Sequence, residues 1–325
     1  MIEDIPVEDK IPDPRITGHV RQSFLVIDSK KYFEPFTALG GEKTAYQKSV
    51  YLAISGLQSI VSTATLPLTL VQDSICQRHF DHILIRKKIE LIPAHDQVSA
   101  HTPEQREEMA IDQANSEMKA YLDSIEGTRF FRNEVVYELS RRLNSREVRT
   151  ASHELLVQSL VSTWSVFESF SREFIVASVN DSPNLALPIM SSKDLKEFFG
   201  KQSIDLETIT AHSFDLTNSM GEILFANRRL DSFLVLKKLY KALLNSAELQ
   251  DALDAKMWEL NQRRHLFVHR RGIVDASYID QTGENLPKGS MLTITGYDIE
   301  AYLYAVRDTI LLIGKASNEG GLQGH

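Results

Sequence analysis

Cysteine is almost absent from this sequence. Cys76 is the only cysteine among 325 residues, so no disulfide can form within the chain and no cysteine-based zinc site is possible. Residues 1–6 are acidic and lack the apolar run of a secretory signal. We therefore expect a protein of a reducing, cytoplasmic compartment.

The common nucleotide-binding and hydrolase motifs are also missing. The sequence has no Gly-x-x-x-x-Gly-Lys-Ser/Thr loop, no Gly-x-Gly-x-x-Gly turn, no His-Glu-x-x-His and no Gly-x-Ser-x-Gly. His79, His82 and His95 are scattered among lysines and arginines and are poor candidates for metal ligands. We therefore expect no cofactor and no metal.

The sequence has no excess of positive charge, because 36 lysines and arginines stand against 44 aspartates and glutamates, for a formal net charge of -8. This balance argues against broad, non-specific binding to nucleic acid. Any RNA footprint should be local, and the candidates are the basic segment 263–271 and the pair Arg228-Arg229.

Residues 49–72 contain no charged side chain at all. The segment is long enough to cross a bilayer, but it is rich in Ser, Thr and Gln and contains Pro67. We therefore expect a buried helix followed by a turn, and no membrane association.

The remaining patterns predict an all-α protein. Apolar residues recur at helical spacing along most of the chain, and Thr102 and Gln105 form a capping box for a helix that runs towards Ile125. Two short β-prone runs interrupt this pattern. The run within 22–37 is expected to form a strand, and the run at 291–295 lies in the segment 280–297, which is expected to form a loop or a small hairpin. Helices are expected from Glu42 onward and over 129–144, 151–179, 192–200, 204–211, 230–245, about 247–272 and 297–316.

We expect two folded regions with a boundary near 145–150. Pro, Asp and Glu dominate residues 1–20 and Gly dominates 317–325, so both predict disordered tails. Residues 21–148 form a mostly helical region of unassigned role, and residues 149–316 form a second helical domain. In the second region Leu156, Leu160, Trp164, Phe167 and Phe174 form one apolar stripe, which predicts core.

The segment 263–271 carries the chemistry. It contains four arginines, two histidines and no acidic residue, and it ends a helix at Gly272. Guanidinium groups hold phosphate oxygens, and a histidine can transfer protons near neutral pH. Spacing alone is weak evidence, because Arg146 and His153 show a similar spacing by chance.

The context of Arg264, His265 and His269 resembles the HEPN family (higher eukaryote and prokaryote nucleotide-binding). That signature is an arginine, a polar residue (often Asn), about three residues and a histidine near the end of the last core helix. The continuation through Gly-Ile-Val-Asp at 272–275 and a Gly-rich loop to Met291 is similar to the RiboL-PSP-like subgroup. The resemblance covers roughly 150–316 and includes an early helix with Trp164 and Glu168.

The resemblance implies a helical bundle that forms a homodimer, with two Arg–His pairs facing each other. It implies a metal-independent endoribonuclease, toxin-like or defence-related. His269 is expected to act as general base on a ribose 2′-OH, the partner's His269 as acid, and Arg264 as the group that stabilises the transition state. His265 and Glu168 would support the site.

Arg263, Arg270 and Arg271 would hold flanking phosphates, and the products would be a 2′,3′-cyclic phosphate and a 5′-OH. Two alternatives stay open: a non-catalytic HEPN module for dimerisation, interaction or nucleotide binding, and a helical scaffold whose N-terminal half carries the function. In the alternatives Arg264 is an ion-pair partner of Glu168 and the other arginines are a solvated helix end. Residues 21–148 could receive a regulatory partner.

Overall fold

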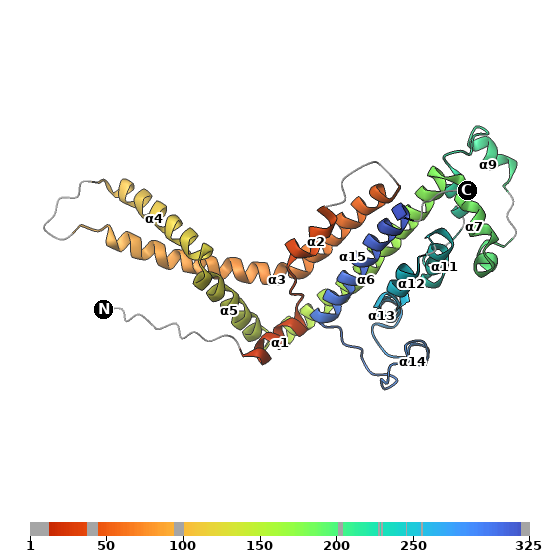
Figure 1. The fold of residues 1–325 in the computed structure, drawn as a ribbon. Helices are drawn as coiled ribbons and strands as arrows, with labels where there is room; N and C mark the ends of the chain where they lie inside the picture. Colours follow the sequence, from red (N-terminus) through yellow and green to blue (C-terminus); the bar gives the residue numbers. More distant parts are fainter. Residues whose placement is uncertain are drawn as a thin grey trace. The chain divides into compact units, whose positions relative to one another are not determined.

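The computed structural model describes residues 13–37, 45–93, 101–200, 204–226, 228, 230–244, 246–254 and 256–319. Within these ranges the chain is all-α, as predicted, and contains no β-strand (Figure 1). One isolated antiparallel bridge joins Ile273 and Met291. The chain divides into two compact units. One boundary follows Phe24, and the other two fall within helices α3 (Ala45–Glu90) and α6 (Arg146–Asp181).

Unit 1 comprises the described residues up to Phe24 together with Thr65–Ser152. Its helices are α1 (Pro14–Ser23), the C-terminal part of α3, α4 (Pro103–Asp123) and α5 (Ile125–Arg142). In Figure 1, α4 runs along α3, where Lys88 pairs with Glu107 at 2.6 Å. The predicted capping box at Thr102 and Gln105 is present. The apolar core contains Val20, Phe24, Val71, Ile75, Ile83, Ala114, Met118, Phe131, Leu139 and Leu143.

Unit 2 comprises Leu25–Ala64 and the chain from His153 onward. It contains α2 (Ser29–Thr37), the N-terminal part of α3 and most of α6. The predicted apolar stripe of α6 is confirmed as core, and Trp164, Phe167 and Phe174 are fully buried. The other elements are η1 (Pro183–Leu185), α7 (Ala186–Ser191), η2 (Lys193–Leu195), α8 (Lys196–Phe199), α9 (Leu206–Ala211), α10 (Met220–Phe225), α11 (Phe233–Leu244), α12 (Ala247–Asp254), α13 (Lys256–Arg270), α14 (Ala276–Thr282) and α15 (Gly296–Glu319).

Residues 25–64, which the sequence suggested to be part of the N-terminal region, belong to unit 2. Two buried tyrosines connect them to α15: the Tyr32 hydroxyl donates to the Leu303 carbonyl at 2.9 Å, and Tyr46 donates to Ile310 at 3.1 Å. Gly314 lets Tyr46 approach, since a Cβ there would lie 2.3 Å from the ring. Long-range packing, which no local pattern encodes, therefore assigns this segment to the second unit.

Helices replace the strand expected within 22–37. α1 begins at Pro14, where Asp13 accepts a hydrogen bond from the Arg15 amide at 2.8 Å, and Val20 is buried. The expected disordered tail therefore does not extend over residues 14–20, and residues 1–12 lie outside the described ranges. The β-prone run at 291–295 forms no hairpin of its own. Its start returns to the end of α13, where the Leu292 amide donates to the Gly272 carbonyl at 2.8 Å.

No turn follows the uncharged segment 49–72, because α3 continues through Pro67 to Glu90. Among the described residues, one helical segment, Tyr46–Glu90, could cross a membrane by length and composition alone, and 28% of its most apolar window is buried. One side of the helix packs into the core, whereas Tyr51 is 68% exposed on the other. The predicted helix is confirmed here, but only one of its sides is buried.

The helix expected over about 247–272 corresponds to α12 and α13, which lie on either side of residue 255, a position outside the described ranges; both pack against α15 (Figure 1). Leu253, Met257, Leu260 and Phe267 are buried and hold this group together. At its C-terminal end, α15 continues to Glu319, into the segment expected to be a tail. Residues 320–325 lie outside the described ranges.

Candidate functional site

α13 presents the basic segment at the end of a well-anchored helix. Leu266 and Phe267 are buried on its inner side. The helix ends where Arg271 and Gly272 adopt left-handed backbone conformations with φ of 53° and 80°. The amide of Gly272 donates back to the carbonyl of Leu266 at 3.3 Å, which closes the last turn. This hydrogen bond defines where α13 ends, directly after the basic segment.

His265, Val268 and His269 are exposed on the outer side of this helix, and the half-buried Arg264 lies next to His265, on the stripe of Met257, Leu260 and Phe267. We name these four residues, Arg264, His265, Val268 and His269, the α13 face. His265 and His269 are exposed, and their ring centroids lie 4.5 Å apart. Residues four apart share one side of a helix, which explains why the rings meet. Val268 is 46% exposed between them and Arg264 is half-buried. The two histidines of the predicted signature therefore share one accessible surface, and the third residue, Arg264, is half-buried beside it.

The charges around His265 favour its neutral form. Partial burial lowers the pKa of His265, and the nearby His269 and Arg264 lower it further, whereas Asp275 raises it. At neutral pH the ring therefore carries an unprotonated nitrogen that can accept a proton.

Glu168 of α6 lies near Arg264. Its carboxylate accepts a hydrogen bond from the Trp164 indole nitrogen at 3.0 Å. Burial raises the pKa of Glu168 and is only partly opposed by the Trp164 hydrogen bond and the charge of Arg264. Among the described residues Arg264 forms no ion pair within 4 Å, and its Nε is buried without a hydrogen-bond partner. No carboxylate of the described residues therefore neutralises this guanidinium by direct contact.

Arg263 points to a different environment. Its guanidinium pairs with Glu259 at 3.0 Å, Asp298 at 3.2 Å and Glu284 at 3.5 Å, and the side chain is only 14% exposed. The Tyr302 hydroxyl donates to Glu259 at 2.7 Å. Three carboxylates already neutralise this arginine. Arg263 therefore does not fit the predicted role of holding a flanking phosphate.

Arg270 and Arg271 lie at the exposed end of α13 and remain accessible to a phosphate. Arg270 pairs with Asp275 at 3.3 Å through a side chain that is 64% exposed. Asp275 is also the N-cap of α14, where it accepts from the Tyr278 amide. The sequence pattern does not predict that Asp275 lies close to His265 and Arg270, although Asp275 belongs to the Gly-Ile-Val-Asp segment at 272–275.

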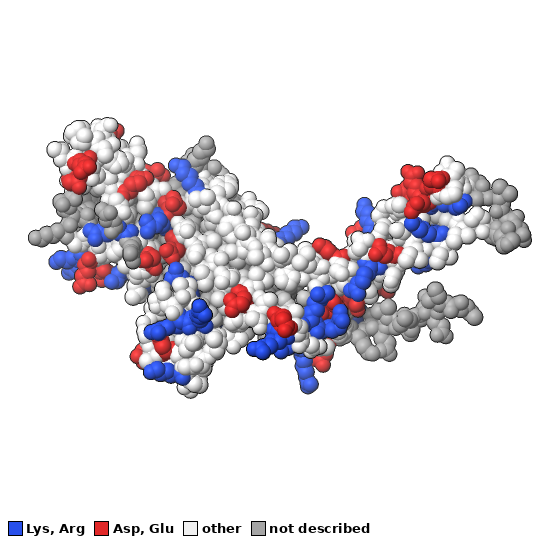
Figure 2. All heavy atoms as spheres, turned by 180° about the vertical axis from the view of Figure 1, so that it is seen from behind, with Lys and Arg blue, Asp and Glu red and all other residues white. Residues whose placement is uncertain are grey.

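The other basic candidates serve other purposes. Arg228 donates to the Phe199 carbonyl at 2.6 Å and is partly buried, whereas Arg229 lies outside the described residues. On the face shown in Figure 2, Lys and Arg lie interspersed with Asp and Glu, and neither sign forms a continuous patch. An extended nucleic-acid footprint is therefore not found on that face.

The histidines of unit 1 do not gather with acidic residues. His79 stacks on Tyr121 with ring centroids 4.8 Å apart, and burial lowers its pKa. His82 is exposed, and His95 lies outside the described residues. Across the described ranges, no three His, Cys, Asp or Glu side chains come together in a way that could hold a metal ion.

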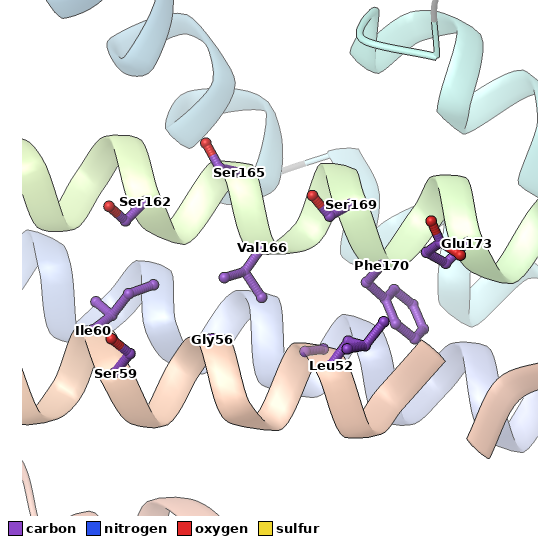
Figure 3. A pocket seen from close by; sticks show the side chains of 11 residues that line it. Leu52, Gly56, Ser59, Ile60, Ser162, Ser165, Val166, Ser169, Phe170 and Glu173 are labelled. Atoms are coloured by element: carbon purple, nitrogen blue, oxygen red, sulfur yellow. The ribbon is translucent and has the colours of Figure 1, made fainter. Parts of the chain in front are cut away.

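A cavity of about 390 Å³ lies elsewhere in unit 2, between α3 and α6. In Figure 3, Val166 and Phe170 point from α6 towards α3, and Ser162 and Ser169 follow the α6 wall. Glu173 is the only charged residue of its lining, and none of the predicted site residues contributes to it. The cavity is lined by hydroxyl groups, apolar groups and one carboxylate, and its lining contains no histidine or arginine.

Comparisons of the chain with protein-family models, curated proteins and solved structures find no match. The assignment of a function therefore depends on the residues and geometry of the α13 face.

Proposed function

We propose that this chain is a metal-independent endoribonuclease of the HEPN type that cleaves RNA at the α13 face. The observation that carries the proposal is the position of His265 and His269 on one accessible surface, with their imidazole rings 4.5 Å apart and the charge of the half-buried Arg264 acting on His265. These groups can move protons and stabilise a phosphate without a metal. The non-catalytic alternative requires none of them to be accessible.

The proposed reaction is attack of a ribose 2′-oxygen on the adjacent phosphorus. The O2′–P bond forms, the P–O5′ bond breaks, and the products carry a 2′,3′-cyclic phosphate and a 5′-OH. Arg264 would stabilise the extra negative charge of the transition state, and the absence of an ion pair to it among the described residues supports that role. The required 2′-OH makes the substrate RNA and not DNA.

The footprint on RNA is expected to be small. Arg270 and Arg271 are the two exposed arginines that could contact flanking phosphates, since Arg263 is held by three carboxylates. A local footprint agrees with a net charge of -8. The proposal also includes a homodimer and a regulatory partner that binds unit 1. It further includes a cytoplasmic location and a toxin-like or defence-related role.

The test is cleavage of end-labelled RNAs of mixed sequence in the presence of EDTA. The wild-type chain is compared with Arg264→Ala, His269→Ala and the control His82→Ala, which removes an exposed histidine of unit 1. We expect cyclic-phosphate products from the wild type and from the control. Loss of a proton-transfer group or of a transition-state donor should slow cleavage about 10²–10⁴-fold.

Two outcomes would contradict the proposal. One is the absence of cleavage by a folded wild-type chain over varied RNAs, which would favour the non-catalytic module. The other is equal activity of wild type and both site variants, which would point to a contaminating nuclease. Circular dichroism of each variant separates loss of chemistry from loss of folding, and sedimentation measures whether the chain is a dimer.

A further inference from the structure

We propose that His265 is the second catalytic histidine, and that His265 and His269 of the same chain form the general base and general acid of the reaction. This inference rests on the proposed function and changes where the second proton-transfer group comes from. The resemblance leads one to expect that group from the partner protomer. The structure places a complete pair of imidazoles on one helix face.

Geometry is the first support. The two rings are separated by 4.5 Å between centroids, with planes inclined by 51°, and both side chains are exposed. A phosphodiester that approaches the α13 face would therefore meet both imidazoles together. Cleavage by in-line displacement needs one group at O2′ and another at O5′ of the same phosphodiester, and a phosphodiester lying across the exposed edges of the two rings would bring one imidazole near each oxygen.

Arg264 adds the third component of the site. It precedes His265 directly, and its charge acts on His265 and on Glu168. A guanidinium close to His265 can hold phosphate oxygens of the substrate while the two histidines transfer protons. One chain thus provides a base, an acid and an anion-stabilising group on a single surface.

The division of labour follows from the surroundings of His265. His269 and Arg264 on α13 and Asp275 at the start of α14 are the charged groups that act on it, and together with partial burial their balance lowers its pKa. A ring that is neutral at pH 7 is suited to take the 2′-OH proton. His269, in its protonated form, would then donate a proton to O5′.

The step balances within one chain. Neutral His265 gains the proton of the 2′-OH as the O2′–P bond forms, and protonated His269 gives its proton to O5′ as the P–O5′ bond breaks. The enzyme ends with the two protonation states exchanged, and proton exchange with water restores them. No oxidant, metal or co-reactant enters the reaction.

The experiment compares His265→Ala and His269→Ala on two RNAs of the same sequence. One is the natural oligonucleotide, and the other carries sulfur in place of the bridging 5′-oxygen at a single site, so that its leaving group needs no protonation. On natural RNA each variant should lose about 10²–10⁴-fold in rate. On the sulfur-containing RNA His269→Ala should recover most of its rate, whereas His265→Ala should remain slow.

A second measurement tests whether the pair acts within one chain. The two inactive variants are mixed under conditions that allow subunits to exchange. No protomer in the mixture then carries both histidines, so we expect no recovery of activity. Recovery by mixing would overturn the proposal, because it would show that the two histidines cooperate between chains.

His265→Asn distinguishes catalysis from positioning. Asparagine can hydrogen-bond but cannot accept a proton at neutral pH, so this variant should be as slow as His265→Ala and should lose the acidic limb of the pH–rate profile. Full activity of His265→Asn, or of His265→Ala, would overturn the inference. The proposed function would still stand if the wild type cleaves RNA and His269→Ala does not.

Discussion

Replacing Arg263 with methionine tests whether this residue is structural. The substitution removes a guanidinium that pairs with Glu259, Asp298 and Glu284 and leaves three carboxylates close together without a cation. Loss of one partner of a fully buried pair costs about 3–5 kcal/mol. The carboxylate side chains here are 25–27% exposed, so we expect a smaller loss of about 2–4 kcal/mol in the free energy of unfolding.

The loss should depend on pH, and its sign follows from Glu259. Burial tends to raise the pKa of Glu259, but hydrogen bonds from Lys256 and Tyr302 and the charge of Arg263 lower it overall. A depressed carboxylate pKa contributes stability above the unfolded-state value, about 4.3, and this stability disappears as the pH falls through the folded-state pKa. The difference between wild type and Arg263→Met should therefore be largest at pH 7 and shrink towards pH 3.

Chemical denaturation followed by circular dichroism at both pH values measures this difference. Arg270→Met is the matched control, because Arg270 is 64% exposed and makes a single ion pair. Its cost should be below about 1 kcal/mol. Equal costs for the two variants, or a cost of Arg263→Met that does not change with pH, would refute the structural role. An unchanged stability with a raised KM for RNA would instead support phosphate binding by Arg263.

Two further predictions concern the surroundings of the α13 face. Gly272→Ala should cost about 1–3 kcal/mol of stability, because φ is 80° and the new Cβ would lie 2.6 Å from the Phe267 ring. Gly289→Ala, with φ of 86° and open space, should cost less in the same thermal unfolding assay. Burial raises the pKa of Glu168, so its ionisation costs stability as the pH rises. The free energy of unfolding of Glu168→Gln, relative to that of the wild type, should therefore be higher at pH 7 than at pH 3. The same difference at both pH values would contradict this.

The parts of the fold that the sequence predicts are those with strong local signals. The capping box at Thr102 and Gln105 determines where α4 begins, and the apolar spacing around Trp164 identifies the buried side of α6. Both signals arise from residues within one or two turns of a helix. The same reasoning placed Arg264 and His269 near a helix end, and α13 ends at Arg270.

The errors arise where distant residues determine the structure. The run within 22–37 has β-prone residues, but α2 becomes helical with Tyr32 buried against α15, which begins more than 250 residues later. A proline inside a helical segment usually ends or kinks the helix, yet α3 continues through Pro67. The association of residues 25–64 with unit 2 depends on the same long-range contacts. None of these contacts leaves a periodic trace in the sequence.

Arg263 and Arg264 show this limit at the site itself. They are adjacent and chemically identical, but helical geometry turns them by about 100° from each other. Arg263 meets Glu284 and Asp298, which follow in later elements, and only the fold reveals that it is neutralised. Arg264 instead forms no ion pair within 4 Å among the described residues, although its charge acts on Glu168 of α6.

The two arginines are nevertheless coupled through the loop that follows α13. Arg263 connects α13 to Glu284, just after α14, and to Asp298 at the start of α15. Asp275, whose charge acts on His265, is the N-cap of that same α14. A change that releases the Arg263 network should therefore also shift the protonation of His265, although no atom of Arg263 belongs to the α13 face. In a preparation of Arg263→Met that remains folded, the acidic limb of the pH–rate profile for RNA cleavage should move. In the Arg270→Met control this limb should move only because Asp275 loses its ion pair with Arg270.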